Sequence, residues 1–162
     1  MKTWSQRAEE VAYLFNPAFC GEILRRCIKE YSETSSNPMP YALIFLALPL
    51  ILHKTTRESV NPRTRQLHLW LQANPEVRIE YAEHARRLVP ITHEALTFLL
   101  QVKAISIDED AQIGVLPYRQ RNLPSQRTGE IAECYTKAAV IGRWFARAGT
   151  SETVYTMLGV KP

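Results

Sequence analysis

The sequence predicts a mainly α-helical domain that carries one small β-hairpin in a winged-helix-like unit. Apolar residues recur at three- and four-residue steps along most of the chain, which is the period of an amphipathic helix. Strict alternation of apolar and polar residues occurs only between residues 104 and 116, where Glu109-Asp110 supplies a turn. The length of 162 residues is typical of one domain, so we expect residues 1–162 to fold as a unit.

Residues 1–60 are expected to form the N-terminal helices. Residues 5–14 suggest a short helix, and Asn16-Pro17 then supplies an N-cap and a first-turn proline for a longer one. A loop is expected from Ser32. The inner face of the longer helix collects Phe19, Cys20, Ile23, Leu24, Cys27, Ile28 and Tyr31.

The apolar run from Tyr41 to Leu52, which contains Pro49, predicts a buried core element. It is too short to cross a bilayer, which takes about 20 apolar residues. The run is apolar on every side, and a chain of this size has little else with which to cover it. We therefore expect part of its cover to come from another protein.

Residues 61–116 are expected to form the winged-helix-like unit. A short helix is predicted around Trp70, and Asn74-Pro75 begins a second helix that ends at Pro90. Thr92 can cap a third helix, which leads into the hairpin.

The remaining chain divides into a basic connector, residues 117–127, and C-terminal helices, residues 128–162. Apolar side chains extend over more than half the circumference of the long helix predicted from Ile131 to Ala148, so one neighbouring face could not bury them all. Ser151 can cap a final short helix, and Gly159 suits its end. The connector carries Arg119, Arg121 and Arg127.

Composition and motifs point away from catalysis. No phosphate-binding glycine loop or nucleophile elbow is present, and the four histidines lack metal-ligand spacing. The three cysteines form no CxxC pair, so reduced core thiols in a cytoplasmic protein are expected. We expect no enzyme activity, cofactor, metal or membrane contact, although a hydrolase site assembled only in the fold stays open. The net charge of +4 permits DNA binding without requiring it.

Five segments spread over nearly the whole chain carry a family resemblance: Leu14–Cys20, Phe45–Lys54, Arg57-Glu58, Ala95–Leu100 and Leu158–Pro162. The chain resembles the middle component of bacterial three-component ABC-ATPase systems, specifically the small third subunit of Lamassu-type anti-phage defence complexes. The resemblance implies a non-enzymatic scaffold that joins an SMC-like, Rad50-like ATPase to a nuclease or other effector and releases the effector upon DNA sensing. DNA would be contacted mainly through the complex.

Helical geometry indicates where such a scaffold could bind its partners. Val140 and Trp144 would form an apolar anchor on the long C-terminal helix, and Lys137 and Arg147 would flank it. A second contact is expected at Lys54 and Arg57, whose cluster could equally be a solvated helix end.

A free-standing winged-helix transcription regulator is the alternative. It would use Arg119, Arg121 and Arg127 to contact DNA phosphates and would bind DNA in a salt-dependent way. Gene neighbours separate the two hypotheses, because an adjacent SMC-like ATPase favours the scaffold.

Overall fold

The computed structural model describes residues 15–118 and 128–161. Helices make up most of this part of the chain, as predicted, and three short strands form one small sheet. The helices are α2 (Pro17–Ser35), α3 (Tyr41–Ile44), α4 (Ala47–Leu52), α5 (Lys54–Ser59), α6 (Leu67–Ala73), the 3₁₀ helix η2 (Pro75–Arg78), α7 (Tyr81–Gln101), α8 (Gly129–Arg147) and α9 (Ser151–Leu158). The strands are β1 (Met39–Pro40), β2 (Ile105–Ile107) and β3 (Gln112–Val115).

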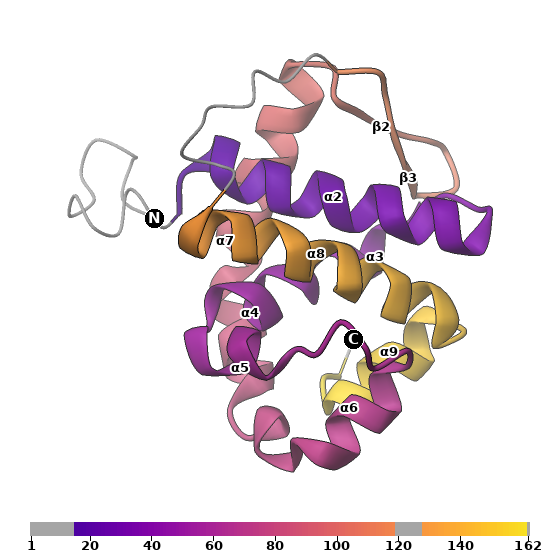
Figure 1. The fold of residues 1–162 in the computed structure, drawn as a ribbon. Coiled ribbons are helices and arrows are strands. Elements are labelled where there is room, and N and C mark those ends of the chain that lie inside the picture. The colour runs from indigo at the N-terminus through magenta and orange to yellow at the C-terminus, as the bar shows by residue number, and fades with distance from the viewer. Residues whose placement is uncertain (1–14, 119–127, 162) are drawn as a thin grey trace.

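Helices α2 and α8 pack side by side through the middle of the molecule (Figure 1). The two helices approach closely at Gly142 of α8, where a Cβ atom would lie only 2.3 Å from the backbone oxygen of Cys27 in α2. Only a residue without a side chain fits at this point. The start of α2 confirms the predicted cap, since the Asn16 side chain accepts hydrogen bonds from the backbone N–H of Ala18 at 2.8 Å and of Phe19 at 3.3 Å. The predicted loop from Ser32 is wrong by one turn, because α2 continues to Ser35.

The apolar run folds into α3 and α4, and the prediction that it is buried is confirmed. The chain itself provides the cover, because α4 packs against α2, α7 and α8. Leu43, Ile44, Leu48, Leu50 and Ile51 are fully buried without any partner. Tyr41, Phe45 and Leu52 of the same run keep partly exposed side chains, so the expectation that another protein covers part of the run stays a prediction.

Two helix boundaries differ from prediction around α7. Asn74-Pro75 begins the short η2 and not the long helix, which starts at Tyr81 after Glu80 adopts a left-handed backbone conformation with φ of 61°. Helix α7 then runs through Pro90 without ending there. Pro90 and Arg86, one turn before it, are both exposed, and a carbonyl left without an N–H donor on the exposed side of a helix can hydrogen-bond to water.

The predicted hairpin is confirmed as β2 and β3, and a third strand extends it. The sheet order is β1-β3-β2 with antiparallel pairing, and Ile113 lies opposite both Ile107 and Met39. The sequence gives no signal for β1, which is two residues long and contains Pro40. The winged-helix character of this unit stays a prediction.

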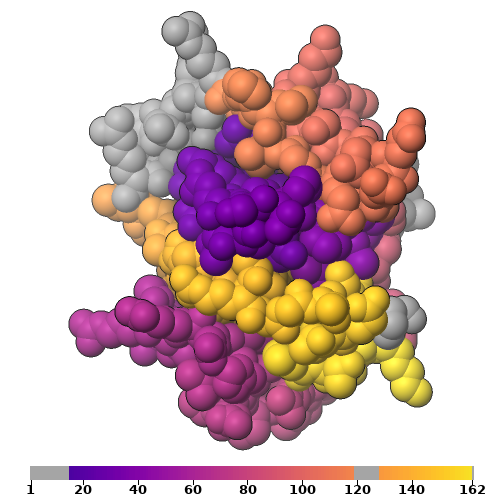
Figure 2. Space-filling view, turned by 90° about the vertical axis from the view of Figure 1, so that its right-hand side faces the viewer, coloured from indigo at the N-terminus to yellow at the C-terminus, as the bar shows by residue number. Residues whose placement is uncertain are grey.

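Helix α8 occupies the middle layer of the fold, which explains its wide apolar surface. Helix α2 packs on one side of it, and α4 and α6 pack on the other. Figure 2 shows residues 128–161 as a yellow band between α2 and the segment that contains α6. The last helix, α9, is capped by Thr150, which accepts from the N–H of Thr153 at 3.3 Å, and not by Ser151 as predicted. Gly159 ends it with φ of 70°, as expected.

Candidate partner interface

The predicted surface anchor lies in the interior of the chain. Val140 and Trp144 are each 1% exposed. The Trp144 ring packs against Trp70 of α6 with 5.0 Å between ring centroids. The expectation of an exposed anchor is wrong because α6 covers this face of α8.

The same face of α8 holds the segment that joins α5 to α6, residues 60–66, which we call the α5–α6 connector. The ammonium of Lys137 donates to the carbonyl of Val60, and the indole N–H of Trp144 donates to the carbonyl of Thr64 at 2.7 Å. Arg147 Nη1 donates to the carbonyl of Arg65 at 3.1 Å. Three residues predicted to contact a partner therefore contact the chain's own backbone. Lys137 is half-buried, whereas Arg147 keeps an exposed side chain.

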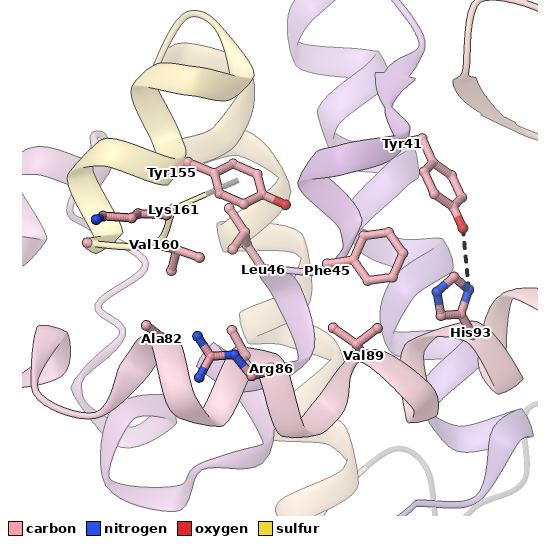
Figure 3. A pocket seen from close by; sticks show the side chains of 12 residues that line it. Tyr41, Phe45, Leu46, Ala82, Arg86, Val89, His93, Tyr155, Val160 and Lys161 are labelled. Atoms are coloured by element: carbon pink, nitrogen blue, oxygen red, sulfur yellow. Dashed lines mark hydrogen bonds between the residues drawn. The ribbon is translucent and has the colours of Figure 1, made fainter.

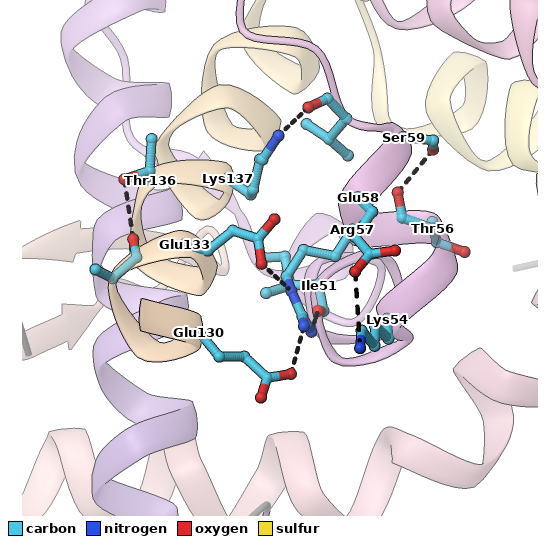
Figure 4. A network of polar contacts seen from close by, with 12 residues as sticks. Ile51, Lys54, Thr56, Arg57, Glu58, Ser59, Glu130, Glu133, Thr136 and Lys137 are labelled. Carbon is cyan, nitrogen blue, oxygen red and sulfur yellow. Dashed lines mark hydrogen bonds and ion pairs between the residues drawn. The ribbon is translucent and has the colours of Figure 1, made fainter. Parts of the chain in front are cut away.

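Arg57 is also an internal residue and not a free contact. Its side chain is 2% exposed and joins α5 to the start of α8 (Figure 4). Its Nη2 donates to Glu130 at 2.5 Å, its Nε donates to Glu133 at 3.2 Å, and its Nη1 donates to the carbonyl of Ile51 at 2.9 Å. Burial alone would lower the pKa of Arg57, but the nearby Cys134 group and the two carboxylates outweigh it and raise the pKa. The guanidinium stays charged and structural.

Lys54 differs from Arg57, although both were predicted to form one contact. Its side chain is 73% exposed and lies 3.9 Å from Glu58 one turn along α5. Such an exposed pair contributes little to stability, so Lys54 stays available to a partner. Arg119, Arg121 and Arg127, the predicted phosphate contacts, lie outside the described residues.

An apolar groove of about 600 Å³ opens between α3, α7 and the tail that follows α9 (Figure 3). It was not predicted, because its residues come from three segments far apart in sequence. A Tyr41 to Phe45 spacing of one helical turn is the only local signal. The lining residues are Tyr41, Phe45, Leu46, Ala82, Ala85, Arg86, Val89, His93, Tyr155, Gly159, Val160 and Lys161.

Aromatic contacts fix one wall of this groove. Phe45 lies edge-on between Tyr41 and His93, with centroid distances of 5.2 Å and 5.1 Å. On the opposite side, the Tyr155 hydroxyl donates to the carbonyl of Ala42 at 2.7 Å. Burial raises the pKa of Tyr155, so its phenol stays a neutral donor near pH 7. The groove is thus formed before any partner arrives.

The charged side chains that line the groove are both basic. Arg86 projects from α7 and Lys161 from the C-terminal tail (Figure 3). Arg86 donates to Glu83 at 3.0 Å, but Arg87 uses the same carboxylate, so one negative charge serves two guanidiniums. This geometry suits an apolar segment that carries carboxylates at its edge.

The described ranges, 15–118 and 128–161, contain neither a metal-binding cluster nor a membrane-spanning helix. They contain no group of three or more His, Cys, Asp or Glu side chains that could hold a metal ion. None of the helices in them combines the length and apolarity needed to cross a membrane. Cys20, Cys27 and Cys134 are buried, as expected, and form no disulfide within the described residues.

Comparison with known proteins identifies the family. Neither the curated proteins nor the solved structures contain a significant match to the chain. The family described as ABC-three component (ABC-3C) system Middle Component 3 matches residues 4–162, which is nearly the whole length. The chain therefore belongs to this family of middle components of three-component ABC systems.

Proposed function

We propose that the chain is the non-catalytic scaffold subunit of an anti-phage defence complex of the Lamassu type. It joins an SMC-like, Rad50-like ATPase to a nuclease or other effector and holds the effector until the ATPase responds to foreign DNA. Membership of the middle-component family is the observation that carries this proposal, because a middle component works with the other components of its system.

The groove between α3, α7 and the C-terminal tail is where we place the partner contact. Its occupant is an apolar segment with flanking carboxylates from another component of the same system. The apolar floor supplies the buried contact, and Arg86 and Lys161 supply the charged rim. This site replaces the interior anchor at Trp144.

Co-purification tests the scaffold role. The tagged chain is co-expressed with the genes adjacent to its own, and the proteins that elute with it are identified by mass spectrometry. We expect a coiled-coil ATPase and an effector in stoichiometric amounts. Elution of the chain alone would refute the scaffold role, and a lone dimer that shifts a palindromic DNA site would support the transcription regulator instead.

A charge reversal tests the groove. The Arg86→Glu/Lys161→Glu variant reverses both basic side chains of the lining, which are exposed and lie outside the core. We expect at least one component to be lost from the eluate. Arg78→Glu/Lys103→Glu makes the same change in charge at exposed positions away from the groove and should leave the complex intact. Equal recovery with both variants would refute the groove while leaving the scaffold role standing.

A further inference from the structure

The α5–α6 connector is a polar segment with a defined conformation. Asn61 closes a turn in it, since its carbonyl accepts from the N–H of Thr64 at 3.0 Å and its side chain accepts from the N–H of Arg63 at 2.9 Å. The hydrogen bonds from α8 to the carbonyls of residues 60, 64 and 65 then hold the connector against that helix. Figure 1 shows it passing the C-terminal half of α8 before it enters α6.

This arrangement gathers three exposed arginines. Arg63 and Arg65 are exposed on the connector, and the exposed Arg147 reaches the backbone of Arg65 from α8. We call them the connector arginines. Their backbone is fixed by the surrounding hydrogen bonds, so a ligand need not order this segment before binding.

The connector arginines have no carboxylate partner among the described residues. The fold pairs other arginines closely: Arg26 lies 2.5 Å from Glu22, and Arg143 lies 2.7 Å from Glu30. Three positive charges are thus concentrated without neutralisation on one short stretch of surface. Such a cluster attracts a polyanion.

We propose that the connector arginines bind the phosphate backbone of double-stranded DNA. Arg63, Arg65 and Arg147 are forked donors that suit phosphate oxygens, and the neighbouring Asn61 and Gln66 offer further polar groups of the kind that contact phosphates. A protein partner would instead require an apolar centre, and residues 60–66 expose no large apolar side chain. The contact is independent of base sequence because phosphates carry no sequence information.

This inference goes beyond the scaffold role, because it assigns a direct DNA contact to the middle component itself. It also concerns a surface other than the predicted basic arm, residues 117–127. The two surfaces can be separated by mutation, and co-purification of the complex does not depend on either.

Fluorescence anisotropy with a labelled 20-base-pair duplex tests the proposal, using the full chain over a range of salt concentrations. Each phosphate contact contributes about 0.9 to the slope of log K against log salt. The Arg63→Gln/Arg65→Gln/Arg147→Gln variant should therefore lose about 2.7 from the slope and bind about tenfold or more weakly at 50 mM salt. The control Arg78→Gln/Lys103→Gln removes two exposed cations that lie outside the groove and form no ion pair within the described residues. It is matched to the double variant Arg63→Gln/Arg65→Gln and should bind nearly as the wild type does.

A second variant serves as the control for loss of folding. Arg63→Gln/Arg65→Gln keeps the Arg147 hydrogen bond and should lose about 1.8 from the slope at an unchanged melting temperature. No binding by the wild type at 50 mM salt, or equal losses in the double variant and its control, would overturn the proposal. Displacement of the duplex by poly-glutamate at equal charge would overturn it in favour of an acidic protein partner.

Discussion

Replacing Trp144 with alanine should destabilise the fold and not merely detach a partner. The indole is 1% exposed, packs on Trp70 at 5.0 Å and donates a 2.7 Å hydrogen bond to Thr64. Truncating a buried aromatic to alanine costs about 3–5 kcal/mol, and a lost hydrogen bond costs about 1 kcal/mol. Because the connector can rehydrate the freed carbonyl, we expect a loss of about 4–5 kcal/mol in the free energy of unfolding.

Thermal and urea unfolding followed by circular dichroism measures this loss. For a chain of this size, 1 kcal/mol lowers the melting temperature by about 2–4 °C, so Trp144→Ala should lower it by about 8–20 °C. The expected loss of about 4–5 kcal/mol is a large share of a typical free energy of unfolding of about 5–15 kcal/mol.

Trp144→Phe serves as the control because it keeps an aromatic ring against Trp70 and removes the hydrogen bond. It should cost about 1–2 kcal/mol. An unchanged melting temperature for Trp144→Ala, together with loss of a co-purifying component, would refute this reasoning. It would show that Trp144 contacts a partner.

Four further results are expected. Gly142→Ala should cost about 3 kcal/mol or more in urea unfolding, because its Cβ would lie 2.3 Å from the oxygen of Cys27 and push two helices apart. Cys27 is fully buried and its pKa is raised by burial, so iodoacetamide should modify it in urea and leave it unmodified in the native protein, as mass spectrometry would show. Burial raises the pKa of Tyr135 to about 12 from 10.0, so the unfolded chain loses this proton first, and the melting temperature should fall as pH rises from 10 towards 12; a flat profile would contradict this. Arg57→Ala should cost about 3 kcal/mol, the low end for a broken buried pair, because Glu130 is 66% exposed and regains water; a loss below about 1 kcal/mol in urea unfolding would show the network to be marginal.

The sequence predicted those features of the fold that depend only on neighbouring residues. The cap at Asn16 and the stop at Gly159 depend on neighbouring backbone groups alone, and both are confirmed. The hairpin depends on alternation and a turn, which are also local. Pro90 was misjudged because a proline removes one donor without deciding whether the helix can continue around it. Asn74-Pro75 does begin a helix, but a start signal does not determine its length, and η2 ends at Arg78.

The candidate sites could not be predicted from the sequence, for a different reason. Arg57 and Lys54 occupy one charged cluster in the sequence, yet one is 2% exposed and the other 73%. The difference arises from Glu130 and Glu133, more than 70 residues away, and no local pattern reports such a pairing. The groove and the connector arginines likewise depend on contacts between distant segments.

The excess of apolar surface on α8 still carries information, although it does not mark a partner site. An apolar arc wider than one neighbour can cover requires a second layer, and α4 and α6 provide it from within the chain. Closing that layer draws the α5–α6 connector across α8, where Trp144 and Arg147 bind its backbone. The burial that removes Trp144 from the surface is therefore the same event that positions Arg63 and Arg65 beside Arg147. If the connector binds DNA, mutations in the core beneath it should weaken both DNA binding and stability. Substitutions of the connector arginines should weaken DNA binding alone.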